Sequence, residues 1–121
     1  MNSLIGIFLG TNQFSGTIPS SLGNLYQLFS LDLGSNQIKG TIPQSLGSLR
    51  SLFSLNLGSN QLTGSIPYSL GTILRLSILD LGTNKLTGTI PPSLQEKISE
   101  APPTLKSHFL IVSLMLLLMY H

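Results

Sequence analysis

The chain has 121 residues, a formal net charge of +2, no cysteine and only 8% charged residues, which fits one small domain or a short repeat array. The lack of cysteine excludes disulfides and cysteine-ligated metal sites. The weak and scattered positive charge argues against a nucleic-acid-binding protein.

A unit of 24 residues repeats along the chain. The stretch LDLGSNQIKGTIPQSLGSL at 31–49 returns as LNLGSNQLTGSIPYSLGTI at 55–73. A fixed period of this length predicts a solenoid, in which each unit forms one coil and stacks on the next. The residues that recur in register are Asn12, Asn36, Asn60 and Asn84, then Gly16, Gly40, Gly64 and Gly88, and then Pro19, Pro43, Pro67 and Pro91.

The first coil is expected to begin with a short strand. Leu4, Ile7 and Leu9 fall in register with the leucines of the later coils. A secretory signal peptide is the alternative interpretation of this apolar start, but no basic segment precedes it and no cleavage site follows it. The register therefore favours a strand.

Each later coil is predicted to carry one short strand followed by a turn. Leu31 and Leu33 alternate along the chain, so both side chains face one side, and one such strand per coil can stack into a parallel sheet. A turning backbone leaves buried polar groups without ladder partners. Asn side chains offer both donors and an acceptor. We call Asn12, Asn36, Asn60 and Asn84 the Asn ladder, and we expect Asn36, Asn60 and Asn84 each to bond this backbone in its own and a neighbouring coil.

The remaining positions of a coil complete the turn. Gly40 suits a positive φ or a close approach, and Pro43 fixes φ without needing a donor bond. Leu46 and Gly47 then close a short helical or 3₁₀ turn on the outer side. The side chains expected to be buried in the second coil are Leu25, Leu28, Leu31, Leu33, Ile38, Ile42 and Leu46.

The residues between the strand leucines are predicted to point outward on the concave side of the sheet. Rigid strands that present columns of side chains make a good recognition surface, although glycine, serine and threonine dominate these columns. Binding usually depends on aromatic or arginine anchors, and on this face only Phe8 is one. The candidate ligand-binding residues are Phe8, Ser30, Asp32, Asn56, Ile78, Asp80 and Lys85.

Several residues near this face also have an interpretation that involves no ligand. Asp32, Asn56 and Asp80 are also explained as ordinary solvated strand residues of the repeat. Phe29 and Phe53 are expected to stack as a pair at the sheet edge, which favours packing over ligand contact.

The sequence predicts no enzyme, no cofactor and no metal site. Both histidines, His108 and His121, lie outside the repeat, so neither a Ser–His pair nor a metal centre on the solenoid is supported. Asp32 and Asp80 lie two coils apart, about 10 Å, which only grazes the carboxylate spacing of an inverting glycosidase.

The repeat pattern fails after Leu94. Gln95 replaces the expected glycine, and the polar, proline-containing residues 96–108 are predicted to form a linker or an irregular cap. Residues 109–121 form an apolar tail, in which the residues from Phe109 to Tyr120 are almost all apolar. As a helix this run would be about 18 Å long, which is short of the roughly 30 Å thickness of a bilayer's hydrocarbon core. The tail has several interpretations: a truncated transmembrane or tail-anchor segment, the removable tail of a lipid-anchor signal, an apolar helix that covers the last coil, or the end of a shortened reading frame.

Residues 4–94 resemble the plant-type leucine-rich repeat, LxxLxLxxNxLxGxIPxxLGxL, and the GxIP element distinguishes this subclass. The resemblance implies an α/β repeat solenoid of about four 24-residue coils, wound as a right-handed superhelix. Its parallel β-sheet would lie on the concave face and its short 3₁₀ or helical turns on the convex face. The expected organisation is a solenoid over 1–95, a linker over 96–108 and the tail over 109–121.

The resemblance also implies a function. Plant-type repeats serve extracellular recognition in receptor-like kinases and receptor-like proteins, so a protein or peptide ligand is expected. A larger leucine-rich-repeat receptor would be a further partner, at the outer side of the plasma membrane. A polygalacturonase-inhibitor-like protein and a truncated remnant with only a structural role are the alternatives. The paired cysteines of the family's N-terminal cap are missing, which predicts an uncovered sheet edge.

Overall fold

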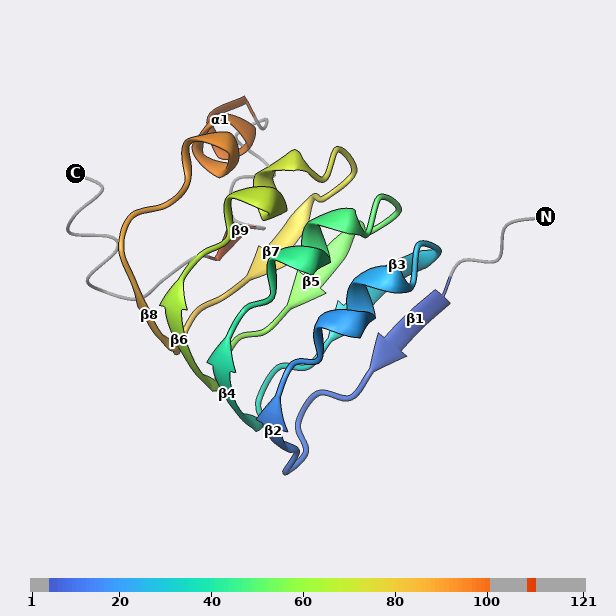
Figure 1. Ribbon diagram of the computed structural model, residues 1–121, viewed down its shortest axis with the longest axis vertical. Helices are drawn as coiled ribbons and strands as arrows, with labels where there is room; N and C mark the ends of the chain where they lie inside the picture. The colour runs from blue at the N-terminus through green and yellow to red at the C-terminus, as the bar shows by residue number, and fades with distance from the viewer. Residues whose placement is uncertain (1–4, 101–108, 111–121) are drawn as a thin grey trace.

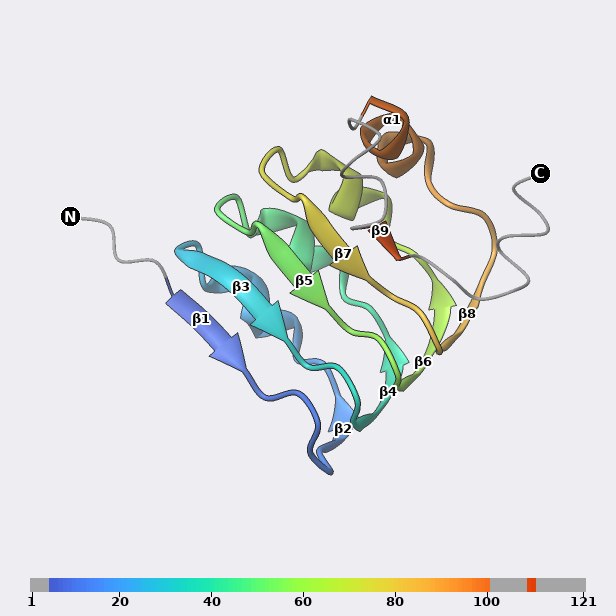
Figure 2. The same ribbon diagram turned by 180° about the vertical axis from the view of Figure 1, so that it is seen from behind.

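The computed structural model describes residues 5–100 and 109–110, which form a solenoid of parallel strands and short turns (Figure 1). One strand of each coil pairs in parallel with a strand of the next, giving a first sheet in the order β1-β3-β5-β7-β9 (Figure 2). The strand bounds are Ile5–Phe8 for β1, Leu28–Asp32 for β3, Ser54–Asn56 for β5, Ile78–Asp80 for β7 and Phe109–Leu110 for β9. The predicted parallel sheet and solenoid are confirmed, while Leu4 lies outside the described residues.

A second parallel sheet, in the order β2-β4-β6-β8, was not predicted. Its strands are mostly polar, and β2, β4 and β6 contain glycine, so their sequence is typical of a turn and not of a strand. Gly40 lies within β4 at a φ of 84°, which is the first of the two alternatives that the sequence left open. The bounds are Ser15–Thr17 for β2, Gln37–Thr41 for β4, Gln61–Ser65 for β6 and Lys85–Thr87 for β8.

Three 3₁₀ turns of the described chain, η1 (Ser20–Asn24), η2 (Gln44–Ser48) and η3 (Tyr68–Thr72), lie on the side away from the first sheet. Each turn follows a proline in extended conformation, as predicted. A Cβ added to Gly47 of η2 would collide with Ser69 of η3. Glycine is therefore required in this column because the next turn lies directly against it.

The core is a continuous stack of aliphatic side chains between the sheets and the turns. Leu31, Leu55 and Leu79 occupy the same position in successive coils, and all three are fully buried. The burial expected in the second coil is correct except for Leu25, which is 40% exposed although its equivalents Leu49 and Ile73 are buried. Leu25 belongs to the first turn of the described chain, so a neighbouring turn packs on only one of its sides.

Residues 96–100 of the expected linker are helical. They continue helix α1 (Pro92–Glu100), which packs against η3 and buries Leu94, whereas the sequence predicted a linker or an irregular cap from residue 96. Gln95 stands where earlier coils have a close-packed glycine. In the described chain no further turn stacks on α1, so a side chain fits and a helix replaces the 3₁₀ turn.

The beginning of the apolar tail forms β9, which pairs in parallel with β7 at the far edge of the first sheet. Leu79 lies opposite Phe109, and Asp80 lies opposite Leu110. Residues 101–108 and 111–121, which hold the rest of the predicted linker and tail, lie outside the described residues. Among the described residues, no helix has the length and apolar character needed to cross a membrane.

Candidate functional site

The outer face of the first sheet, which we call the recognition face, presents two neighbouring columns of side chains. Strand register places Gly6, Ser30, Ser54 and Ile78 in one column, and Phe8, Asp32, Asn56 and Asp80 in the other. The leucines between the columns point into the core and hold the strands rigid. The structure thus brings six of the seven candidate residues onto one surface.

Lys85 is the candidate that the structure does not bring to this surface. It lies in β8 of the second sheet, where it pairs with Thr63 of β6. The turn at Thr83, whose φ is 55°, redirects the chain between Asp80 and Lys85. Counting residues from the last strand leucine could not reveal this change of direction, so the prediction for Lys85 is wrong in its placement.

The acidic and amide side chains of the second column shape the ends of their strands. Oδ1 of Asp32 accepts the N–H of Gly34 at 3.0 Å, and Oδ1 of Asp80 accepts the N–H of Gly82 at 2.9 Å. Asn56 makes the same bond to Gly58 at 2.9 Å. Within the described residues, no donor bonds Oδ2 of either aspartate. One oxygen of each carboxylate is therefore committed to the turn, and the other has no donor among the described residues.

The same side chains fill the space above the glycines of the preceding coil. A Cβ added to Gly34 would lie 2.8 Å from Oδ1 of Asn56, and one added to Gly58 would lie 2.6 Å from Oδ1 of Asp80. These contacts explain the glycines that follow β3 and β5.

Phe8 is the exposed apolar anchor of the recognition face. Its side chain is 70% exposed, and its ring lies over Gly6, where an added Cβ would collide with the ring carbons. Ser30 lies beside Gly6 on the neighbouring strand. A ligand that reaches this corner meets an aromatic surface with small residues around it, which lets its backbone come close.

The Asn ladder joins successive coils below this face. Nδ2 of Asn60 donates to the carbonyls of Leu57 in its own coil and Leu33 in the preceding coil, at 3.1 and 3.0 Å. Its Oδ1 accepts the N–H of Ile38 at 3.0 Å. Asn36 and Asn84 repeat this arrangement, which is the bonding expected from the sequence. Asn12, in contrast, is exposed and donates only within its own coil.

The sequence did not reveal four left-handed residues that precede the ladder asparagines. Thr11, Ser35, Ser59 and Thr83 have φ values between 55° and 57°, which residues other than glycine seldom adopt. The N–H of Ser35 donates to the carbonyl of Gly58 at 2.8 Å, so the next coil holds this conformation in place. The recurring Ser or Thr before Asn was the only sequence signal.

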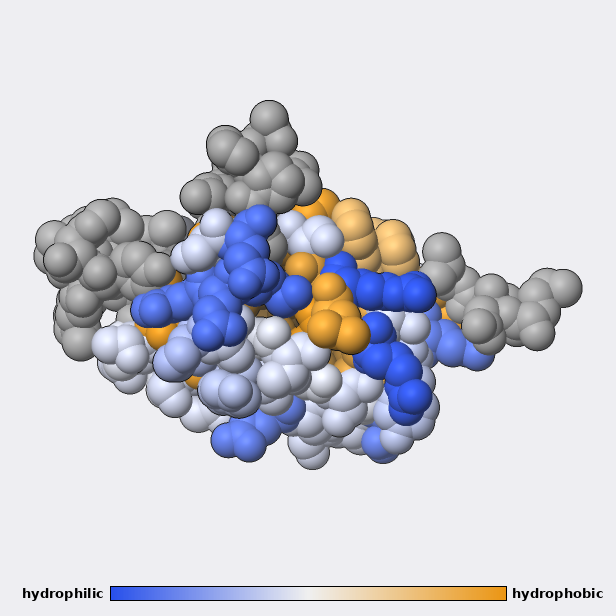
Figure 3. Space-filling model, turned by 90° about the horizontal axis from the view of Figure 1, so that it is seen from above, coloured by the Kyte–Doolittle hydropathy of each residue, from blue (hydrophilic) through white to orange (hydrophobic). Residues whose placement is uncertain are grey.

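Aromatic and cationic groups pair at the beginnings of strands β3 and β5 and in the loops that precede them. The rings of Phe29 and Phe53 stack with centroids 5.2 Å apart and an interplanar angle of 3°, which confirms the predicted pair. The guanidinium of Arg50 lies 5.0 Å from the ring centroid of Tyr26. Seen from above, this side of the molecule mixes apolar with strongly hydrophilic side chains (Figure 3).

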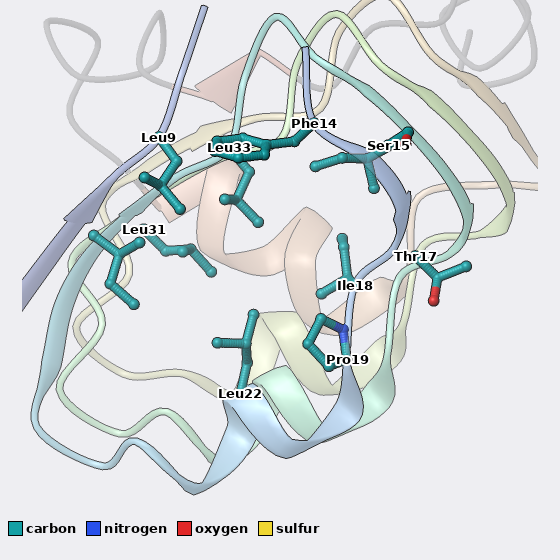
Figure 4. A pocket seen from close by; sticks show the side chains of 11 residues that line it. Leu9, Phe14, Ser15, Thr17, Ile18, Pro19, Leu22, Leu31 and Leu33 are labelled. Carbon is teal, nitrogen blue, oxygen red and sulfur yellow. The ribbon is translucent and has the colours of Figure 1, made fainter. Parts of the chain in front are cut away.

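The N-terminal end of the solenoid holds a hollow of about 250 Å³ (Figure 4). Its walls are the side chains that later coils bury in the core, and they come from β1, the following turn, η1 and the second coil. The residues that line its apolar wall are Ile7, Leu9, Phe14, Ile18, Leu22 and Leu33. The sequence predicted an uncovered sheet edge here but not a cavity.

Nothing in the described residues forms a metal cluster of histidine, cysteine, aspartate and glutamate side chains. His108 and His121 lie outside the described residues. The recognition face therefore has the chemistry of hydrogen bonding, charge and apolar contact.

Comparison with known proteins agrees with this geometry. A family model described as leucine rich repeat matches residues 2–62, and a second leucine-rich-repeat model matches residues 75–96. The chain belongs to the leucine-rich repeat family. No curated protein sequence matches it.

Solved structures of plant receptors show which kind of leucine-rich repeat this is. The chain is 43% identical to the protein in the crystal structure of PEPR1–AtPEP1, with a TM-score of 0.74 over 77% of this chain and 13% of that one. It is 41% identical to a chain of the BIR3–SERK2 complex from Arabidopsis thaliana, with a TM-score of 0.72 over 74% of this chain and 48% of that one.

A third structure is the ectodomain of the plant membrane receptor kinase GASSHO1/SCHENGEN3 from Arabidopsis thaliana, in complex with CASPARIAN STRIP INTEGRITY FACTOR 2. It is 39% identical, with a TM-score of 0.74 over 76% of this chain and 11% of that one. The repeats are thus of the plant type, and this leucine-rich-repeat chain spans less than half the length of these relatives.

Proposed function

We propose that this leucine-rich-repeat chain is a non-catalytic recognition module whose recognition face binds an extended peptide or protein segment. The observation that carries the proposal is the pair of columns on the first sheet. Phe8 supplies an exposed aromatic surface, and Asp32 and Asp80 each keep one carboxylate oxygen outside the turn bonds. Gly6, Ser30 and Ser54 form a column of small residues beside them.

The spacing of these groups defines the ligand. Neighbouring strands lie about 4.8 Å apart, so Phe8 and Asp80 are separated by three strand spacings, roughly 14 Å. About four residues of an extended peptide cover that length. A ligand that crosses the strands would therefore place an apolar side chain at Phe8 and basic or amide groups at the aspartates.

The similar structures support this proposal by what they contain. One is named as PEPR1 with AtPEP1, and another as the receptor kinase HAESA in complex with a peptide hormone ligand. Those complexes belong to the longer proteins, and the BIR3–SERK2 complex likewise joins two named partners. A larger leucine-rich-repeat receptor is accordingly the second partner that we propose for this chain.

Peptide selection tests the proposal directly. A displayed library of linear peptides is selected against the full chain, and the affinity of the selected peptide is measured for variants by calorimetry. Phe8→Ala is expected to weaken binding by about tenfold or more, as expected for an aromatic anchor. Asp32→Asn keeps the turn acceptor, as the natural Asn56 does, so it removes charge without removing the bond to Gly34.

Lys85→Ala, on the second sheet, is the matched control and should leave the affinity unchanged. A selected peptide that binds the Phe8→Ala and Asp32→Asn variants as tightly as the natural chain would contradict the proposed face. A polygalacturonase-inhibitor-like role would be supported if the chain inhibited that enzyme, and a purely structural remnant would bind neither probe.

Membrane attachment is a separate proposal. We infer it from the almost uninterrupted apolar residues 109–120, and it would place the module on the outer side of the plasma membrane. Carbonate extraction of the full chain and of a version that ends at Pro103 tests it. Loss of membrane association only in the shortened chain supports an anchor, whereas two soluble chains would leave β9 as a cap on β7.

A further inference from the structure

We propose that the recognition face selects a peptide in the polyproline II conformation that carries two basic residues three positions apart. This inference rests on the proposed function, because it names the class of ligand that the same face would bind. It uses strands β3, β5 and β7, and within them the column formed by Asp32, Asn56 and Asp80.

The charge of this column alternates from strand to strand. Register places Asp32 on β3 and Asp80 on β7, with the neutral Asn56 between them on β5. Both aspartates are half-buried, and among the described residues no donor bonds Oδ2 of either one. A ligand that pairs with both carboxylates must therefore carry two cations with a neutral segment between them.

The distance between the two carboxylates selects the backbone conformation of the ligand. Neighbouring strands lie about 4.8 Å apart, so Asp32 and Asp80 are separated by two strand spacings, roughly 9.6 Å. In a fully extended peptide, side chains on the same side are about 6.7 Å apart, and residues three apart point to opposite sides. A polyproline II helix rises about 3.1 Å per residue with three residues per turn, so residues three apart point the same way at about 9.3 Å. Of these two open conformations, the polyproline II helix matches the column.

The hydrogen-bonding groups between the carboxylates favour this conformation over an α-helix. Oδ1 of Asn56 accepts the N–H of Gly58, and among the described residues Nδ2 of Asn56 makes no hydrogen bond. Ser30 and Ser54 add hydroxyl groups in the neighbouring column. The carbonyls of a polyproline II peptide have no internal partners and need such donors, whereas those of an α-helix are bonded within the helix. The face therefore offers donors to an open backbone and acceptors to its two cations.

Three synthetic peptides of one composition test the spacing. Each has six prolines, two arginines and blocked ends, and the arginines are two, three or four positions apart. Calorimetry at low salt measures their affinity for the full chain. The peptide with arginines three apart is expected to bind about fivefold more tightly than either isomer, because only this peptide reaches both carboxylates. Glycine in place of proline at the same spacing should weaken binding, because a flexible chain loses more entropy when it is ordered.

A charge-conserving pair of substitutions tests the role of the two carboxylates. Asn56→Asp combined with Asp80→Asn keeps the net charge, and it keeps a turn acceptor in each strand, since Asp32 and Asn56 naturally make the same bond. The two carboxylates then lie one strand apart instead of two, so the preference for the three-residue spacing should disappear. Asp32→Asn alone should likewise lower the affinity of the preferred peptide to that of its isomers.

Glu96→Gln is the matched control, because it removes one negative charge at an exposed position of α1. It should leave both the affinity and the preference for spacing unchanged. Circular dichroism of each variant shows that the comparison is made between folded chains.

Three results would overturn the inference. The first is equal affinity of the three proline peptides, or binding by none of them. The second is a preference for spacing that survives in the folded Asn56→Asp, Asp80→Asn chain. The third is equal binding of the glycine peptide and the proline peptide.

The proposed function is decided separately, because selection from a peptide library presupposes no conformation. A selected peptide that depends on Phe8 and Asp32, beside proline peptides without any preference for spacing, would retain the recognition face and reject the polyproline II ligand.

Discussion

The interior coils and the N-terminal coil use nearly the same residues at the same positions, but the two regions differ in what those residues do. An interior leucine such as Leu57 is fully buried, and an interior asparagine such as Asn60 bonds two coils. Leu9 and Asn12 occupy the same positions in the first coil and are exposed. Burial and bonding in a solenoid therefore come from the neighbouring coil and not from the residue alone.

Truncation of a core leucine should show the largest difference between the two regions. Leu57→Ala is expected to lower the free energy of unfolding by about 2–5 kcal/mol, because it leaves a cavity in a fully packed layer. Leu9→Ala removes the same atoms from a half-covered position and should cost about 1 kcal/mol or less. Urea unfolding of both variants measures the difference. Equal losses would show that the first coil is packed as well as the interior.

Removal of a ladder asparagine should give the next largest difference. Asn60→Ala leaves the N–H of Ile38 and the carbonyls of Leu33 and Leu57 without their side-chain partner, at a cost of about 1–3 kcal/mol or more. Asn12→Ala breaks only exposed bonds within one coil and should cost less than about 1 kcal/mol.

The measurement for the ladder is again the unfolding free energy, together with hydrogen exchange at Ile38. Faster exchange at Ile38 in Asn60→Ala, but not in Asn12→Ala, would locate the lost bond. Exchange that is the same in both variants would show that the backbone alone holds the coils together.

The smallest effect is expected at the C-terminal end of the solenoid, where α1 packs against η3, and it concerns how stability depends on pH. Burial lowers the pKa of Lys97, while Glu100 opposes the shift, and Nζ of Lys97 donates to the carbonyl of Leu74 at 3.4 Å. The unfolded chain then holds this proton more tightly than the folded chain, so stability should rise with pH between the lowered pKa and the ordinary value of 10.5. Lys97→Met should remove that rise.

Lys39→Met, at an exposed lysine of β4, is the control for the pH effect and should leave the rise in place. Thermal unfolding of the three chains at several alkaline pH values measures it. An unchanged pH dependence of stability in Lys97→Met would mean that Lys97 is not buried enough in solution for its pKa to be lowered.

The sequence predicted a residue's role correctly where that role depends on its own coil and on the equivalent residue of the neighbouring coil. The strand leucines, the positive φ at Gly40, the 3₁₀ turn after Pro43 and the Phe29–Phe53 stack all follow from a repeated unit placed on its own image. It failed where the chain changes direction or where the repeat ends. Lys85 was placed on the first sheet although it lies in the second, and residues 96–100 of helix α1 were predicted to belong to a linker or an irregular cap.

For the recognition face, the sequence supplied the candidate residues but not their geometry. The bonds from Asp32 and Asp80 to the following glycines arise from the turn, and the left-handed Ser35 and Thr83 depend on strand register between coils. Such features involve backbone conformations that the short polar sequence of the turn, GSNQ at 34–37, does not specify by itself.

The sequence by itself determined that this is a leucine-rich-repeat solenoid, because a 24-residue period of leucine, asparagine, glycine and proline can bury its apolar face only by stacking. The tertiary structure alone decided which copies of that unit are buried, which sheet each polar residue joins, and that α1 and β9 follow the last coil while a hollow lies beside the first described strand. The physical reason is that stacking energy belongs to the contact between two coils, and a terminal coil has only one such contact.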